Sequence, residues 1–203
     1  MSAPQQPPPP SASPPSSLPS PLPYVLVTGN PGKLAEARRL AGAGLGAVEL
    51  DLPEIQSLDL LEVLRHKGEE AWRRLRRPLV VEEAGLDLAA LGGFPGPLVK
   101  WMLEAAGAGT IARAALALGD PRAVARAALY YRDAGRTLVA EGSTAGALVL
   151  PARGEHGFGW DPVFQPDGLD RTFGELTGPE KDALSHRGKA WRQLLASLED
   201  PRT

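Results

Sequence analysis

Residues 24–33 read YVLVTGNPGK, and this stretch decides the fold class. Its apolar first half, residues 24–28, is typical of a buried strand, and the Gly-Asn-Pro-Gly that follows is typical of a turn. From Lys33 onward, apolar residues recur at helical spacing. A strand, a glycine-containing loop and a helix in this order predict an α/β unit.

The loop of this unit has the chemistry of an anion site. It brings together backbone N–H groups, the positive end of a helix dipole and the ammonium of Lys33. The spacing from Gly29 to Lys33 is too short for the phosphate loop of ordinary nucleoside triphosphatases, and Leu34 replaces their magnesium-binding hydroxyl residue. The alternative interpretation is a tight turn with a capped helix and a surface lysine.

The same periodicities, followed outward from this unit, predict the remaining elements. Helices are expected at residues 33–43, 60–76, 95–106, 110–118 and 179–198. Further strands are expected at residues 47–50, 79–81, 123–132, 136–141 and 144–150, with a hairpin turn at residues 133–135. This mixture of strand–helix units and a hairpin predicts an α/β fold with a mixed sheet.

Composition narrows the class of protein. The 203 residues are 43% hydrophobic and 23% charged, which suffices for a globular core. A net charge of -2 argues against a nucleic-acid-binding protein. The absence of cysteine excludes disulfides and thiolate metal sites and suits a reducing cytoplasm, where we expect the protein. No apolar run reaches the roughly 18 residues of a membrane helix, so no membrane contact is expected.

The first 23 residues differ from the rest of the chain. Residues 1–23 are rich in Pro and Ser and carry no charged side chain, so we expect a disordered tail that precedes one domain at residues 24–203. Its short proline run at residues 7–10 leaves open the alternative of a ligand for a proline-reading domain.

Two adjacent acids are candidates for catalysis. Glu82 and Glu83 follow the apolar strand at residues 79–81 and are expected at its C-terminal end, where open α/β sheets bind ligands. A carboxylate there can bind Mg²⁺ or accept a proton from water. The alternative is a solvated charge pair, and Glu54 in a nearby loop has no stronger claim by itself.

Two later segments carry further candidates. Phe158 and Trp160 flank a glycine beside Asp161, and aromatic rings on such a segment can stack on a nucleobase or plug the core. Ser185-His186-Arg187 falls on the last predicted helix, where Lys181 and Ser185 share one face. A single histidine on a helix is more often structural, so this triplet alone assigns no function.

Taken in order, these motifs resemble the inosine triphosphate pyrophosphatase family, closest to its eukaryotic branch. The resemblance lies in DLPEIQ at residues 51–56, ALGGFPGP at 90–97, KW at 100–101, FGWDP at 158–162, and TGPEK at 177–181 with SHR at 185–187. It implies an elongated mixed sheet with flanking helices around a central nucleotide-binding cleft. It also implies a Mg²⁺-dependent homodimer that hydrolyses ITP, dITP and XTP to the monophosphate and pyrophosphate.

The resemblance also implies a role for individual residues. It implies that Glu83 and Lys33 are catalytic and that Glu54 and Glu83 bind Mg²⁺. The phosphates are expected to contact Thr28, Gly29, Asn30, Lys33 and Lys67. The base and its surroundings are expected to involve Phe158, Gly159, Trp160, Asp161, Lys181, Ser185, His186 and Arg187.

Three residues depart from the family's pattern and touch the chemistry. Glu83 stands where relatives carry Asp, Ala84 where Ser or Thr is common, and Asp182 where Asn is usual, which we expect to add negative charge near the phosphates. These departures leave two alternatives open. The chain could be a catalytically weak or silent purine-nucleotide-binding homologue, or a pyrophosphatase acting on other modified nucleotides.

Overall fold

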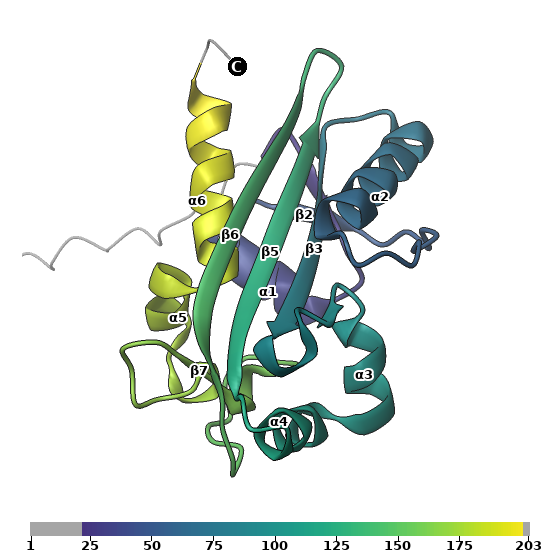
Figure 1. Ribbon diagram of the computed structural model, residues 1–203. Helices are drawn as coiled ribbons and strands as arrows, with labels where there is room; N and C mark the ends of the chain where they lie inside the picture. Colours follow the sequence, from purple (N-terminus) through teal and green to yellow (C-terminus); the bar gives the residue numbers. More distant parts are fainter. Residues whose placement is uncertain (1–21, 201–203) are drawn as a thin grey trace, which may run out of the picture.

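The computed structural model describes residues 22–200, so nearly all of the tail expected at residues 1–23 lies outside the described residues. Its framework is a seven-stranded sheet in the order β2-β1-β3-β5-β6-β7, with β4 beside the far end of β3 (Figure 1). The strands are β1 (Val25–Val27), β2 (Gly46–Val48), β3 (Leu79–Leu88), β4 (Pro95–Gly96), β5 (Arg122–Arg132), β6 (Thr137–Leu148) and β7 (Phe164–Pro166). The strand β1 runs parallel to β2 and β3, and the other pairings are antiparallel, so the predicted mixed α/β fold is confirmed.

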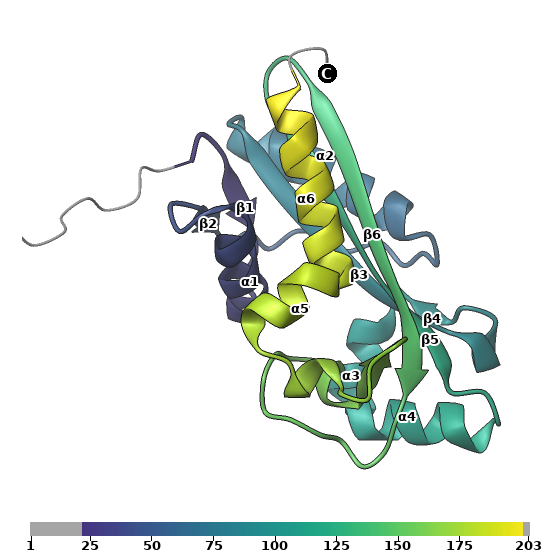
Figure 2. The ribbon, with the colours of Figure 1, turned by 90° about the vertical axis from the view of Figure 1, so that its left-hand side faces the viewer.

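Helices cover both faces of this sheet. They are α1 (Pro31–Ala41), α2 (Leu60–Leu75), α3 (Val99–Ala106), α4 (Ala108–Ala117), α5 (Gly178–Leu184) and α6 (His186–Glu199). Because side chains alternate along a strand, Leu129 packs under α1 and α6 while Tyr130 packs under α2. Figure 2 shows α1, α5 and α6 together on one side of the sheet. None of the helices within residues 22–200 is long and apolar enough to cross a membrane.

A third apolar cluster lies at the lower end of the sheet in Figure 1. There α3 and α4 pack on the far ends of β3 and β5 through residues such as Val99 and Ile111. Trp160, Phe164 and Phe173 belong to the same cluster. The segment that follows β6 is thereby attached to the core rather than left as a free loop.

The strand β3 is longer than the sequence pattern predicts, and this corrects the placement of the two acids. Glu82 and Glu83 lie in the middle of β3, not at its end, because β5 pairs with β3 all the way to Leu88. Parallel pairing with β1 nevertheless stops at Val81, and β4 joins the same edge only at Leu86. Between these two partners, residues 82–85 form a strand edge that no strand of the described chain covers.

Four other predicted elements are also corrected. The strands expected at residues 136–141 and 144–150 are one strand, β6. The helix expected at residues 95–106 begins only at Val99, because prolines at 95 and 97 disfavour the α-helical conformation in the residues before them. The helix expected at residues 179–198 is two helices, since Ser185 is extended and its hydroxyl caps α6 by accepting the amide of Gly188.

Candidate active site

A large cleft opens at the uncovered edge of β3. Its volume is about 1260 Å³, and its walls come from the loop after β1, from α2, from α3, from residues 158–161 and from the start of α6. The cleft brings together most residues expected in the site: Thr28, Gly29, Asn30, Lys33, Glu54, Lys67, Glu83, Phe158, Gly159, Trp160, Asp161, His186 and Arg187.

The loop after β1 is held in shape by its own side chains. The hydroxyl of Thr28 accepts a hydrogen bond from the backbone amide of Asn30 at 3.0 Å. The side chain of Asn30 accepts one from the backbone amide of Lys33, also at 3.0 Å. Asn30 is thus the N-cap of α1, and Pro31 occupies the first helical turn without an amide to satisfy. The amides and dipole of the helix start therefore face the cleft, as an anion site requires.

A segment far away in sequence, residues 158–161, packs directly against this loop. A Cβ atom added to Gly32 would lie 2.5 Å from the ring of Phe158, so only glycine permits this approach. The backbone amide of Phe158 in turn donates to the Asp161 carboxylate at 2.7 Å. The loop expected to bind phosphates and the segment expected to bind the base are therefore in direct contact.

Glu54 and Glu83 converge on one ammonium. Lys67, on α2, donates to Glu83 at 2.7 Å and to Glu54 at 3.1 Å, and Lys100, on α3, donates to the second oxygen of Glu54 at 3.0 Å. Burial by itself would raise the pKa of Glu54, but the charges of Lys67 and Lys100 outweigh it and hold this pKa below its usual value. Both carboxyls thus belong to one local cluster on the wall of the cleft.

This cluster fits a magnesium ion that is shared with a substrate. Within residues 22–200, no three His, Asp or Glu side chains converge as a complete metal site. Mg²⁺ is commonly bound by one or two carboxylates, with phosphate oxygens and water completing its octahedron. The pair Glu54 and Glu83 supplies that number of hard oxygen donors.

Beneath the cleft lies a buried network of charged side chains. Lys181 donates to Asp161 at 2.5 Å and to Glu36 at 2.7 Å, while Arg187 binds Glu36 and donates to Glu82 at 2.9 Å. Each of these five residues is at most 4% exposed. Unpaired buried charges are costly, so the contacts fix the relative positions of β3, α1, α5 and α6.

Lys33 completes the charge balance of the network. The five buried residues carry three negative and two positive charges, and the Lys33 ammonium lies 3.6 Å from Glu82 at the cleft surface. The same ammonium donates to the carbonyl of Glu82 at 3.4 Å. Lys33 is therefore positioned by β3 as well as by its own helix.

The inner end of the cleft holds polar atoms without protein partners. Both ring nitrogens of His186, the indole nitrogen of Trp160 and one carboxylate oxygen of Glu82 are buried and accept or donate no hydrogen bond within the described chain. Burial lowers the pKa of His186 well below its usual value, and nearby Arg187 lowers it further, so the imidazole is neutral. Buried groups of this kind are normally satisfied by a ligand or by ordered water.

The sequence pattern of the Ham1 family matches residues 24–197. The chain belongs to the Ham1 family. Two relatives are named inosine triphosphate pyrophosphatases. One, from Puccinia graminis f. sp. tritici, is 34% identical over 85% of this chain and 95% of its own length. The other, inosine triphosphate pyrophosphatase 2 from Trypanosoma cruzi, is 41% identical over 84% of this chain and 89% of its own.

Among solved structures, a HAM1 protein from Coxiella burnetii is similar, with a TM-score of 0.72 and 28% identity over 86% of this chain and 97% of that one. Together with the curated relatives, this confirms the family resemblance inferred from the motifs. The Ham1 match begins at the strand β1 and covers every element that contributes to the cleft.

Two of the expected residues lie outside the lining of the Ham1-family cleft. Lys181 is 3% exposed and lies below the cavity, bound to Asp161 and Glu36. Ser185 is 1% exposed and acts as the N-cap of α6. The geometry assigns both to positioning, and contact between either residue and a substrate stays a prediction.

The expectation about Asp182 is corrected. Its carboxylate does not face the loop expected to bind phosphates but accepts two hydrogen bonds from Arg39, at 2.7 and 3.0 Å. The negative charge of Asp182 is therefore paired with a guanidinium on α1. This departure from the family's pattern links α1 to α5 and adds no free charge to the cleft.

Two residues of the site were not predicted from the sequence. Glu36 is buried between Lys181 and Arg187, which follow it by 145 and 151 residues, so no local pattern reveals the contact. The helix expected at residues 33–43 carries four charged side chains, so Glu36 does not stand out in it. Lys100 belongs to a quoted motif, but its contact with Glu54 depends on how α3 folds back over the cleft.

Proposed function

We propose that this protein hydrolyses non-standard purine nucleoside triphosphates, namely ITP, dITP and XTP, to the monophosphate and pyrophosphate. One observation carries the proposal. A single cleft joins a helix N-terminus with Lys33, a pair of carboxylates, and the orphaned polar atoms of Trp160 and His186. The names of the relatives in the Ham1 family support the same reaction.

The triphosphate is proposed to lie over the loop at residues 28–33. The amides at the start of α1 donate to phosphate oxygens, and Lys33 stabilises the negative charge that develops during hydrolysis. Lys67 lies within hydrogen-bond distance of both carboxylates and supplies a second cation to this end of the cleft. Most of the rate acceleration then comes from preorganised electrostatics, as is usual in phosphoryl-transfer enzymes.

Glu54 and Glu83 are proposed to hold Mg²⁺, which when bound neutralises phosphate charge. Glu83 is also proposed to accept a proton from the water that attacks the α phosphorus. The extra methylene of Glu83, compared with the Asp of relatives, is matched by the 2.7 Å contact with Lys67, which fixes the carboxylate.

The purine is proposed to lie between Phe158 and the start of α6. The indole N–H of Trp160 and the N–H of neutral His186 can donate to the 6-keto oxygen of hypoxanthine or xanthine. Adenine carries an amino donor at that position and would leave these donors unpaired. The loss is about 1–3 kcal/mol per unpaired group, which corresponds to a roughly 5- to 150-fold preference for 6-keto bases.

We further propose a cytoplasmic homodimer. The cysteine-free sequence suits a reducing compartment, and the family resemblance carries the dimer. Light scattering on the purified chain tests the dimer directly, and a mass of one chain would contradict it.

The test is steady-state pyrophosphate release from dITP, XTP, dGTP, dATP and dUTP with and without Mg²⁺. Wild type is compared with Lys33→Ala and Glu83→Gln, and nucleotide binding is measured by calorimetry in parallel. The proposal expects Mg²⁺-dependent release with higher kcat/KM for dITP and XTP than for dATP, and a large loss of kcat in both variants. Tight binding without release would instead support a silent homologue, and preferential release from dUTP a different substrate class.

A further inference from the structure

Lys67 bridges the two carboxylates that are proposed to bind Mg²⁺. Its ammonium lies 2.7 Å from an oxygen of Glu83 and 3.1 Å from an oxygen of Glu54. The side chains of Lys67 and Glu83 are only 16% and 13% exposed, so solvent screens this contact weakly. A metal ion that takes both carboxylates as ligands therefore competes with this ammonium for the same oxygens.

The second oxygen of Glu54 is occupied as well. Lys100 reaches it from α3 at 3.0 Å, so both oxygens of Glu54 have an ammonium partner. Two positive side chains thus neutralise the two negative ones of the pair. Mg²⁺ is attracted by the negative charge of its oxygen ligands, and a neighbouring ammonium repels it. We therefore expect the pair to have little affinity for Mg²⁺ while both ammonium groups are in place.

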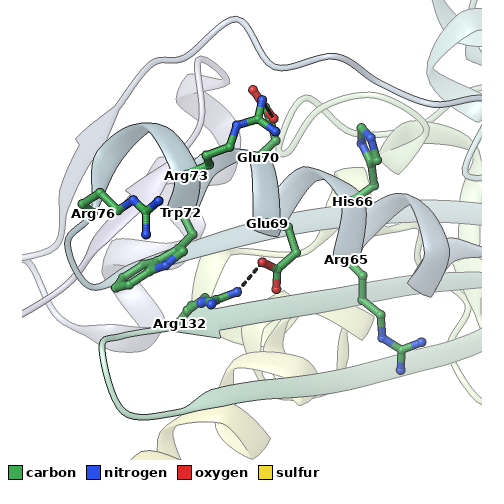
Figure 3. Close-up of a pocket in the computed structure, with 8 residues that line it drawn as sticks. All are labelled: Arg65, His66, Glu69, Glu70, Trp72, Arg73, Arg76 and Arg132. Atoms are coloured by element: carbon green, nitrogen blue, oxygen red, sulfur yellow. Dashed lines mark hydrogen bonds and ion pairs between the residues drawn. The ribbon is translucent and has the colours of Figure 1, made fainter.

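The helix α2 holds Lys67 in this position. Gly68 lies so close to the ring of Tyr130 that an added Cβ atom would clash with it, so this turn of the helix is pressed onto β5. On the face of α2 that points away from the cleft, Glu69 forms an ion pair with Arg132 at the end of β5 (Figure 3). Because these contacts fix the backbone at Lys67, its ammonium can leave the carboxylates only by rotation of its own side chain.

A triphosphate offers this ammonium a different partner. Lys67 lines the same cleft as the loop at residues 28–33, over which the triphosphate is proposed to lie. Lysine has a flexible four-carbon stem, and charge-assisted hydrogen bonds from an ammonium to phosphate oxygens are strong. A bound triphosphate therefore competes with Glu54 and Glu83 for the Lys67 ammonium.

We propose that Lys67 makes metal binding dependent on the nucleotide. Without nucleotide, its ammonium holds the carboxylates of Glu54 and Glu83, and with nucleotide it turns to the phosphates and leaves both carboxylates to Mg²⁺. The inference rests on the proposed function, because it takes this pair as the metal ligands. Nucleotide and metal then bind cooperatively, with the usual coupling of about 5- to 150-fold in affinity.

The test is Mn²⁺ binding to the nucleotide-free protein, followed by electron paramagnetic resonance of the free ion. Mn²⁺ replaces Mg²⁺ because it favours the same carboxylate and water ligands and is paramagnetic. Lys67→Met keeps a long side chain but removes its charge, and it is expected to bind Mn²⁺ at least about tenfold more tightly than wild type. Glu54→Gln added to this variant should abolish the gain, which places the bound ion at the pair.

Two further variants control for charge and for folding. Lys33→Met removes a positive charge from the same cleft, but Lys33 contacts Glu82 and neither carboxylate of the pair, so it should bind Mn²⁺ about as weakly as wild type. Lys100→Met frees one oxygen of Glu54 and should give a smaller gain than Lys67→Met. The Lys100 side chain is 52% exposed, so this variant is expected to fold and decides the test if Lys67→Met does not.

The dependence on nucleotide is measured by the relaxation rate of water protons with Mn²⁺ and the α,β-methylene analogue of dITP. Wild type should enhance this rate strongly only with the analogue, whereas Lys67→Met should do so without any nucleotide. Strong enhancement by nucleotide-free wild type, equal Mn²⁺ affinities of wild type and the folded lysine variants, or an equal gain in Lys33→Met would overturn the inference, even if wild type releases pyrophosphate. The expected gain in a protein that releases no pyrophosphate would refute the proposed reaction alone.

Discussion

At the scale of single residues, the site depends on the position of the Glu83 carboxylate. Glu83 reaches Lys67 at 2.7 Å, and Lys67 also holds Glu54. Shortening Glu83 by one methylene withdraws its carboxylate from this contact by more than 1 Å. Misplacement of that size commonly costs up to about 100-fold in rate.

We therefore expect Glu83→Asp to lower kcat for dITP by about 10- to 100-fold, even though aspartate is the residue of relatives. Steady-state kinetics at saturating Mg²⁺ provides the measurement, with Glu83→Gln as the variant that keeps the length but removes the charge. A rise in kcat for Glu83→Asp would mean that the longer side chain limits the enzyme.

His186 gives the protein a specific dependence on pH. Burial first, and Arg187 second, lower the pKa of His186 in the folded state, whereas the unfolded chain has the ordinary value near 6.5. Below that pH the unfolded state binds a proton that the folded state does not. Stability is then complete above pH 6.5 and falls as the pH decreases, by up to about 1.4 kcal/mol per pH unit.

Urea unfolding between pH 5.5 and 7.5 measures this effect. His186→Gln stays neutral throughout and is expected to flatten the dependence, although the variant is less stable overall. His66 and His156 are exposed, so His66→Gln serves as a control that should keep the wild-type slope. Equal slopes for His186→Gln and wild type would show that the imidazole titrates normally.

Residues of the cleft could be predicted where the neighbouring sequence indicates their role. The loop at residues 28–33 can be predicted from the sequence because a strand, a turn and a helix follow one another directly. Glu54 has no local signal and depended on the family resemblance. Glu36 was missed because its partners are more than 140 residues away, and only the folded chain brings them together.

At the scale of elements, the helix α6 packs so closely on the strand β6 that their backbones are in contact at Gly142. A Cβ atom added to Gly142 would lie 2.1 Å from the carbonyl oxygen of His186 and 2.6 Å from the amide of Ala190. Gly142→Ala must therefore displace the start of α6, which carries His186 and Arg187. We expect a loss of about 1–3 kcal/mol in unfolding free energy together with a fall in kcat/KM for dITP.

Gly109→Ala is the matched control for this prediction. Gly109 lies on α4, where an added Cβ atom meets nothing within 4 Å. Alanine is favoured over glycine in a helix by about 0.5–1 kcal/mol, so the melting temperature should rise slightly with unchanged activity. If both variants unfolded like wild type, the close packing of α6 on β6 would be refuted.

The predicted boundaries of some elements are wrong because tertiary pairing overrides the local sequence pattern there. Adjacent glutamates and Gly85 look like the end of a strand, yet β5 continues the ladder and extends β3 to Leu88. Similarly, the apolar spacing of residues 179–198 runs through Ser185, and only its extended backbone divides the helix in two. Strand and helix types were predictable because buried faces impose their periodicity, whereas these boundaries depend on distant partners.

At the scale of the whole molecule, the cleft joins the chain's separate apolar clusters. Its walls come from α1 and α6 on one face of the sheet, from α2 on the other, and from α3 and residues 158–161 at the lower end. The buried network of charged side chains from Asp161 through Glu36 to Glu82 lies where these apolar clusters meet. A nucleotide in the cleft therefore contacts groups from each cluster and should stabilise the molecule as one cooperative unit.

We expect a non-hydrolysable α,β-methylene analogue of dITP with Mg²⁺ to shift a single thermal transition upward. At a hundred times Kd the gain is about 2.7 kcal/mol, which corresponds to roughly 5–10 °C for a chain of this size. The corresponding dATP analogue at the same concentration should give a smaller shift, because its amino group leaves the Trp160 and His186 donors unpaired. Lys33→Ala should lose most of the shift with both analogues, since the phosphates then lack their ammonium. Calorimetry that resolved two transitions, only one of them moved by the ligand, would show that the cleft does not couple the two ends of the sheet.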